Sequence, residues 1–152
     1  MPARIDIPTF GLHRPGLKYV KRPCAFGIAA RPDGQVLCVN VTRAGQSWTD
    51  LPGGKIETGE SETGALIREF EEETGRACRP VRLLVRTRQY LVTAKGKPRL
   101  NHSAYYEVEE TGRADRDLEP DHEPVWLTPE DAIVELREEA AALAVMLWMR
   151  AD

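Results

Sequence analysis

Three glutamates that a helix would bring together are the residues of this chain best suited to chemistry. Glu69, Glu72 and Glu73 stand at i, i+3 and i+4, so a helix through 68–74 carries all three carboxylates on one face. Like charges at this spacing destabilise a helix by roughly 0.3 kcal/mol per pair, unless a positive charge compensates. Oxygen ligands suit Mg²⁺ or Mn²⁺. The spacing therefore predicts a divalent-metal site, and the alternative is an acidic helix face that is merely solvated.

The residues around this segment favour the metal site. The pair Gly53-Gly54 predicts a tight loop with close backbone approach. Ser61 can cap the helix through its side-chain oxygen, and Gly75 stands where a left-handed helix cap is expected. The segment is thus predicted to be a loop, a helix and a second loop.

Residues 54–76 resemble the sequence box of the Nudix hydrolase family. That box reads Gly, five residues, Glu, seven residues, then Arg-Glu-apolar-any-Glu-Glu-any-Gly-apolar. The positions that match it in register are Gly54, Glu60, Arg68, Glu69, Phe70, Glu72, Glu73 and Gly75. Arg76 departs from it, because an aliphatic residue is usual there, and the neighbouring Ala77 is the candidate for that buried place. The resemblance extends over most of residues 17–150 and implies an α+β fold, an α/β/α sandwich with a mixed β-sheet between helices.

The resemblance also implies roles for the charged residues. A phosphoanhydride repels incoming water, so its cleavage needs cations and a base. Glu72 and Glu73 would hold one or more Mg²⁺, or Mn²⁺, and the Gly53 carbonyl would complete the ligands. Glu69 would bind metal or take the proton from the attacking water, and which glutamate acts as base varies within the family. The expected catalytic residues are Glu69, Glu72 and Arg68.

The other charged residues of the box leave alternatives open. Arg68 lies at i, i+4 to Glu72 and could orient that carboxylate, or it could form a surface ion pair worth about 1 kcal/mol or less. Glu60 is expected to tie the loop to the helix. Glu57 lies outside the strict pattern and is a candidate ligand for a second ion.

Substrate-binding candidates lie outside the box. Lys97 and Arg99, at a turn between two strands, could meet phosphates, although turn residues of this kind often face solvent. Trp48 and Tyr90 could stack on a base, and the alternative for each is packing in the core or at an edge. A later loop could add a carboxylate near the metal, or be solvated. Its polar residues are Glu119, Asp121, His122 and Glu123.

The apolar pattern predicts the elements around the box. Strands over 17–30 and 36–41, joined by a Pro32-Asp33-Gly34 turn, are predicted to form a hairpin. Two more strands are expected over 81–93 and 100–109. A short strand over 125–127 is followed by one helix that Thr128 caps. Its apolar stripe is predicted to be Ile133, Leu136, Ala140, Leu143 and Leu147.

Length and composition bound the class of protein. At 152 residues we expect an N-terminal arm over 1–16 and a single domain over 17–152. The arm has few other obvious uses, which makes a homodimer plausible. A net charge of -3 argues against nucleic-acid binding. Three widely spaced cysteines and the lack of a long apolar run predict reduced thiols in a soluble, cytoplasmic protein.

The function expected is a Mg²⁺-dependent pyrophosphohydrolase acting on a nucleoside diphosphate linked to another group. Nucleoside triphosphates, including oxidised ones, are the plainest small-molecule substrates. The alternatives are a dinucleoside polyphosphate or nucleotide-sugar hydrolase, and a nucleotide-sensing module without turnover. A purely structural interaction protein is the remaining hypothesis.

Overall fold

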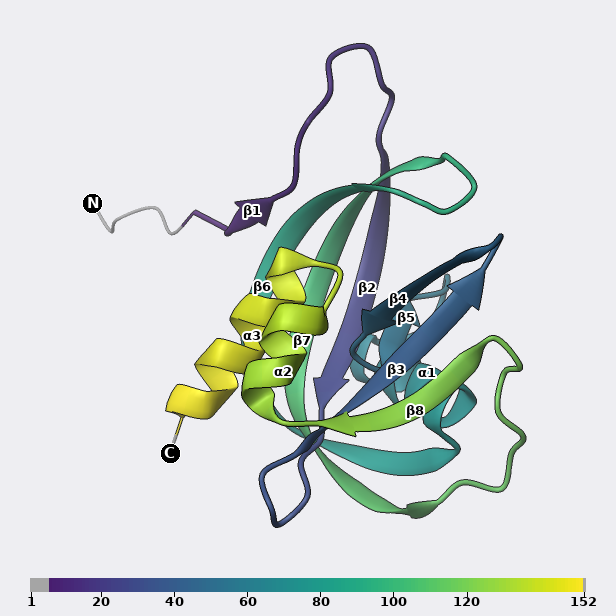
Figure 1. Ribbon diagram of the computed structural model, residues 1–152, viewed down its shortest axis with the longest axis vertical. Coiled ribbons are helices and arrows are strands. Elements are labelled where there is room, and N and C mark those ends of the chain that lie inside the picture. The colour runs from purple at the N-terminus through teal and green to yellow at the C-terminus, as the bar shows by residue number, and fades with distance from the viewer. Residues whose placement is uncertain (1–5, 152) are drawn as a thin grey trace.

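The computed structural model describes residues 6–151, and residues 1–5 and 152 lie outside the described part (Figure 1). Within these described residues, five strands are followed by one helix, then by three strands and two helices. The strands are β1 (Thr9–Phe10), β2 (Val20–Ile28), β3 (Val36–Arg43), β4 (Gln46–Asp50), β5 (Gly53–Lys55), β6 (Arg76–Val92), β7 (Pro98–Arg113) and β8 (His122–Leu127). The helices are α1 (Glu62–Thr74), α2 (Pro129–Glu135) and α3 (Glu139–Arg150).

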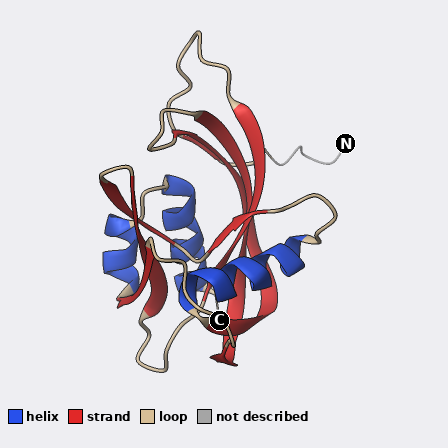
Figure 2. Cartoon of the chain, turned by 90° about the vertical axis from the view of Figure 1, so that its right-hand side faces the viewer, coloured by secondary structure: helices blue, strands red, loops and turns tan. Residues whose placement is uncertain are grey.

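The described strands form two sheets. A five-stranded mixed sheet has the order β1-β6-β7-β2-β5, in which β2 runs parallel to β7 and β6 runs antiparallel to it. A three-stranded antiparallel sheet has the order β4-β3-β8. Figure 2 shows the strands running between the helices. The larger sheet therefore forms the centre of the fold.

Strand β2 separates two apolar clusters. Phe26 and Ile28 pack in one cluster with Val145 of α3, whereas Ala25, on the opposite face of β2, packs in the other with Phe70 of α1. Successive residues of a strand point to opposite faces, so the alternating apolar residues of β2 serve both clusters. The predicted α/β/α sandwich, with a mixed sheet between helices, is confirmed.

Helix α1 begins and ends at the capping residues that the sequence predicts. The Ser61 Oγ accepts a hydrogen bond from the Gly64 N–H at 3.0 Å. The Gly75 N–H donates to the Glu71 carbonyl at 2.9 Å, and Gly75 has a φ of 69°, a left-handed conformation that favours glycine. Phe70 is fully buried on the face toward the sheet. These caps and this face set the direction in which the box glutamates point.

The hairpin predicted before the box is wrong. The turn itself forms, with the Gly34 N–H donating to the Arg31 carbonyl at 2.9 Å, but pairing does not continue beyond a bridge between Ala30 and Val36. Both edges of β2 are occupied by β7 and β5, so β3 pairs with β4 and β8 in the other sheet. Apolar alternation indicates a strand without showing its partner.

The single helix predicted after Thr128 is also wrong, because it is divided into α2 and α3. Leu136 has a ψ of 129°, which is extended. Its backbone forms a parallel bridge with Thr49, and the Arg137 N–H donates to the Thr49 carbonyl at 3.0 Å. Strand β4 therefore holds these residues out of a helix, and this contact is invisible in the apolar stripe.

The strands after the box were correctly predicted, although both are longer than expected. They form β6 and β7, and the Thr93 N–H donates to the Lys97 carbonyl at 2.9 Å in the turn between them. The short strands β4 and β5, on either side of Leu51-Pro52, were not predicted. They place Trp48 and Gly53 beside the cavity described below.

The segment before β2 contacts its own chain. Thr9 and Phe10 pair with Arg88 and Gln89 of β6, and Phe10 packs against the core. This part of the predicted arm therefore packs on its own chain. Residues 1–5 of the arm lie outside the described part. A homodimer stays a prediction. All three cysteines are buried and free. Within residues 6–151, none of the helices combines the length and apolar character needed to cross a bilayer.

Candidate active site

A cavity of about 490 Å³ opens beside the loop that precedes α1. Its lining comes from the strands β2 to β8, from α1, from the turn between β6 and β7, from the loop before β8 and from the break between α2 and α3. Gly53, Gly54, Glu69 and Glu73 line the part of the wall formed by the box. Two of the three predicted carboxylates, those of Glu69 and Glu73, thus line the same cavity.

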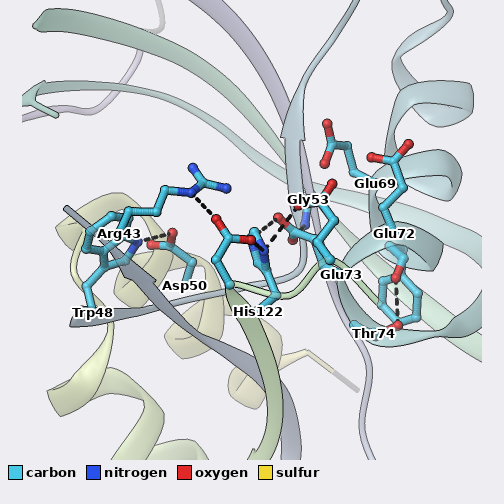
Figure 3. Close-up of polar contacts among 12 residues, drawn as sticks. Arg43, Trp48, Asp50, Gly53, Glu69, Glu72, Glu73, Thr74 and His122 are labelled. Atoms are coloured by element: carbon cyan, nitrogen blue, oxygen red, sulfur yellow. Dashed lines mark hydrogen bonds and ion pairs between the residues drawn. The ribbon is translucent and has the colours of Figure 1, made fainter. Parts of the chain in front are cut away.

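Glu73 is held by two donors from other elements. Its Oε1 accepts a hydrogen bond from the Gly53 N–H at 2.9 Å, and its Oε2 lies 2.9 Å from His122 Nε2 (Figure 3). The residue is only 7% exposed. Burial raises the pKa of Glu73, and the two donors act in the opposite direction by favouring the charged form. The carboxylate is therefore fixed in one orientation beside the cavity.

Arg68 lies among the remaining carboxylates of the box. Its Nε and Nη2 lie 2.7 and 2.8 Å from the two oxygens of Glu60. Its Nη1 lies 3.1 Å from Glu69 Oε1 and 3.2 Å from Glu72 Oε2. One guanidinium thus offsets the repulsion between two helical glutamates and ties α1 to the preceding loop. Glu60 also contacts the backbone of this loop, because its Oε1 accepts a hydrogen bond from the Glu57 N–H at 2.9 Å.

Glu69 combines burial with like-charged neighbours. Burial, followed by the charge of Glu73, raises the pKa of Glu69 to about 7. A Cβ added to Gly54 would lie 2.8 Å from Glu69 Cδ, so this carboxylate occupies the space that the glycine leaves. The box glycine is therefore needed where the backbone passes Glu69.

These residues fit a hard divalent cation. The donors are carboxylate oxygens, and within the described chain Glu69 Oε2 accepts no hydrogen bond. Arg68 Nη1 contacts both Glu69 and Glu72, whereas Glu73 contacts His122. The group of potential ligands within 4.8 Å of one another in residues 6–151 is instead Glu119, Asp121 and His122.

His122 links that group to α1. Its side chain is 2% exposed, with Nδ1 2.7 Å from Asp121 Oδ1 and 3.2 Å from Glu119 Oε2. Asp121 in turn pairs with Arg43 of β3. Burial lowers the pKa of His122, but the contacts with Glu73 and Asp121 outweigh it and raise the pKa to about 9. The sequence left the role of this loop open. His122 reaches the box through Glu73, and the Glu119 N–H donates to the Glu72 carbonyl at 3.1 Å.

Three of the four residues predicted to bind substrate line the cavity, and the fourth does not. Trp48, Lys97 and Arg99 line the cavity. Tyr90 does not, because its ring packs against those of Tyr19 and His13, with centroids 4.9 and 5.1 Å away. The structure therefore removes Tyr90 from the group that can meet a ligand in this cavity.

Two predicted metal ligands lie away from the cavity wall. Glu57 is exposed in the loop before α1 and does not line the cavity. Glu72 also lies outside the lining, where its Oε1 is 3.2 Å from Arg116 Nη1 and its carboxylate contacts Arg68. A metal role for either residue stays a prediction.

Sequence reasoning missed another part of the cavity lining. Asp50 ends β4, Asn101 lies on β7, and Arg137 and Glu138 occupy the break between the last two helices. No motif marks these residues, and only the tertiary structure brings them together. We call Asp50, Asn101 and Glu138 the acidic floor.

Comparisons with known proteins agree with this fold and this box. A family model described as the NUDIX domain matches residues 20–149. A MutT NUDIX hydrolase from Burkholderia pseudomallei is 28% identical and has a TM-score of 0.62, over 84% of this chain and 98% of that one. A NUDIX hydrolase from Nitrosomonas europaea is 20% identical with a TM-score of 0.68, over 86% of this chain and 90% of that one.

A curated relative matches a shorter stretch. The uncharacterized Nudix hydrolase YvcI of Bacillus subtilis (strain 168) is 49% identical over 43 residues, which are 28% of this chain and 26% of the relative. The match thus spans about a quarter of that relative's length. The family model covers most of the present chain, and the fold agrees with it. This chain belongs to the Nudix hydrolase family.

Proposed function

We propose that this protein is a Mg²⁺-dependent hydrolase that cleaves a phosphoanhydride bond in a nucleoside diphosphate linked to another group. Nucleoside triphosphates, including oxidised ones, are the first candidates. Family membership supports the reaction class, and the cavity supports a small nucleotide as substrate. Its volume of about 490 Å³ falls within the range of roughly 300–1,000 Å³ of small-molecule sites.

One observation carries the proposal: carboxylates and cationic side chains line the same cavity. Glu69 and Glu73 lie at the box, where they could hold a cation. A polyphosphate with its divalent cation needs both kinds of contact, because the cation binds oxygen ligands and the phosphates bind positive groups. The cationic residues of the lining are Arg22, Arg43, Lys95, Lys97, Arg99 and Arg137.

We assign separate roles in cation binding, substrate binding and proton transfer to the residues of the site. We assign the cation to Glu69, Glu72, Glu73 and the Gly53 carbonyl, where bound Mg²⁺, or Mn²⁺, would withdraw charge from the phosphate oxygens. Lys97 and Arg99 would bind the phosphates, and Trp48 would contact the base. Glu69 Oε2, which accepts no hydrogen bond in the described chain, is the atom that we propose takes the proton from water. Arg68 would position Glu69 and Glu72.

A nucleotide panel tests the proposal. The purified protein is mixed with Mg²⁺ and nucleoside triphosphates, an oxidised purine triphosphate, a dinucleoside polyphosphate and a nucleotide sugar. We expect turnover that EDTA abolishes, and Mg²⁺ restores it. Product analysis in ¹⁸O-labelled water then shows which phosphorus receives the hydroxyl.

A matched pair of variants tests the site. Glu69→Gln should lower kcat by about 100-fold or more, because the amide cannot take a proton. Glu71→Gln changes a glutamate of the same helix that does not line the cavity, and should leave kcat within about twofold. Tight nucleotide binding without product on the whole panel would instead support the sensing module. Equal activity of the two variants would remove Glu69 from its role.

A further inference from the structure

The acidic floor lies outside the box and has unmet hydrogen-bonding capacity. Glu138 is only 4% exposed, yet it lines the cavity. Its Oε1 accepts a hydrogen bond from Asn101 Nδ2 at 3.1 Å. Within residues 6–151, its Oε2 accepts none, and the side chain forms no ion pair. A buried carboxyl costs free energy unless donors satisfy it, and here only one of the two oxygens of Glu138 has a donor among the described residues.

Helix capping does not explain Glu138. It stands at the N-cap of α3, but its side chain makes no capping hydrogen bond. The Ala140 N–H is instead met by Gln89 Oε1 at 3.2 Å. The carboxyl group therefore faces the cavity without serving the helix to which it belongs.

The two neighbours of Glu138 on the floor also present acceptors. Asp50 Oδ2 accepts hydrogen bonds from Trp48 Nε1 at 2.8 Å and Arg137 Nη2 at 3.3 Å, whereas its Oδ1 accepts none in the described chain. Asn101 Oδ1 is buried and has no hydrogen-bond partner there. The floor thus offers acceptors in excess of donors, and burial together with the charge of Asp50 raises the pKa of Glu138 to about 7.

Aromatic groups also line the cavity, and Trp48 among them contacts the acidic floor through Asp50. Trp48 and Phe26 both contribute to its lining, and the Arg137 guanidinium lies 4.5 Å from the centre of the Trp48 ring. Flat apolar surfaces beside fixed polar groups suit a planar heterocycle. The matching ligand is planar and carries N–H donors on one edge.

We propose that the acidic floor binds a nucleobase edge with two adjacent N–H donors, the arrangement of N1–H and the 2-amino group in guanine. The two oxygens of one carboxylate can accept both. Adenine presents an acceptor next to its amino group, which would face a carboxylate oxygen unfavourably. This inference deepens the proposed function, because it names the base of the substrate whose phosphates lie at the box.

The inosine nucleotides ITP and IMP provide the sharpest comparison, because their base is guanine without the 2-amino group. We expect kcat/KM for GTP to exceed that for ITP by about tenfold or more, because an analogue without the donor leaves a buried acceptor unpaired. ATP should be the poorer substrate of the three. Calorimetric titration without metal should show the same order, with GMP binding more tightly than IMP.

Glu138→Gln tests the residue. Its amide offers one oxygen and cannot accept both N–H groups, so the GTP-to-ITP ratio should fall about tenfold. The amide also carries a donor beside its acceptor, which matches N1 and the amino group of adenine, so ATP turnover should rise relative to GTP turnover. Glu135→Gln, an exposed control on α2, should keep the wild-type ratio. Far-UV circular dichroism checks that the variants fold. Asp50→Asn serves as the second floor variant should Glu138→Gln fail to fold.

The outcomes separate this inference from the proposed function. Turnover without a GTP-to-ITP difference, or an equal loss for all three nucleotides in Glu138→Gln, would overturn the base assignment and leave the hydrolase intact. Absence of turnover with tighter binding of GMP that depends on Glu138 would overturn the hydrolase and leave the base assignment. Neither turnover nor selective binding would overturn both.

Discussion

His122 Nε2 lies 2.9 Å from Glu73 Oε2, so a histidine of β8 holds a carboxylate that α1 contributes to the site. The contact is enclosed, with side chains 2% and 10% exposed. Removal of one member of such a buried pair leaves the other without its partner. The histidine is therefore expected to support both the fold and the orientation of Glu73.

His122→Ala should reduce the free energy of unfolding by about 3 kcal/mol, because Glu73 stays buried without that donor. Mn²⁺ affinity should fall about tenfold, because a group that orients a metal ligand is lost. Urea denaturation and electron paramagnetic resonance titration with Mn²⁺ measure the two effects. His122→Asn keeps an N–H donor, so its losses of unfolding free energy and of Mn²⁺ affinity should both be smaller. Unchanged Mn²⁺ affinity in the alanine variant would show that Glu73 needs no such support.

The two glycines before α1 should separate catalysis from folding. Gly54→Ala places a Cβ 2.8 Å from Glu69 Cδ, at the end of a flexible side chain, so the carboxylate moves and kcat falls by at least about tenfold. The free energy of unfolding should change by less than about 1 kcal/mol. Nucleotide turnover and urea denaturation check this pair of results.

Gly53→Ala should act on the fold instead. Gly53 has a φ of 147°, and its Cβ would lie 2.2 Å from the Ala25 carbonyl oxygen, so backbone must shift. We expect a loss of roughly 2–3 kcal/mol in the free energy of unfolding. Gly59→Ala is the control, because φ is 87° there but the space around it is open. Equal losses at 53 and 59 would show that the close approach to β2 is unimportant.

Glu138 should make stability depend on pH. Its pKa is raised from 4.5 to about 7 in the folded state, so the folded protein binds the proton more tightly than the unfolded chain. Its contribution is fully present below about pH 4.5 and is lost as pH rises through about 7. Glu138→Gln should therefore gain about 3 kcal/mol relative to wild type between pH 4.5 and pH 8. Urea denaturation at both pH values measures this gain, and an identical difference at each would contradict the raised pKa.

Lys97 and Arg99 should affect substrate binding more than the chemical step. Alanine at either position should raise KM for a triphosphate several-fold with little change in kcat, because a phosphate contact is lost. The effect should shrink in about 0.5 M salt, which screens exposed charges. Lys18→Ala, an exposed lysine outside the cavity lining, is the control. A rise in KM that is equal in Lys18→Ala and Lys97→Ala and does not depend on salt would argue against phosphate contacts.

Local signals in the sequence were sufficient for the box. Ser61 and Gly75 mark the ends of α1, and helical spacing puts Glu69, Glu72 and Glu73 on one side, because caps and periodicity act within a few residues. The same signals placed the long strands on either side of the turn at 94–98. They did not show that Tyr90 packs against the segment before β2.

The amino-acid sequence by itself determined the family box, its helix and the charged groups that suit a divalent cation. Only the tertiary structure decided that β2 and β3 belong to different sheets, that His122 reaches Glu73, and that Leu136 leaves the helical path to pair with Thr49. This last contact brings Glu138 to the cavity. The physical reason is that spacing along one helix is a local property, whereas strand partners and helix breaks depend on contacts between distant segments, whose energies no local pattern records.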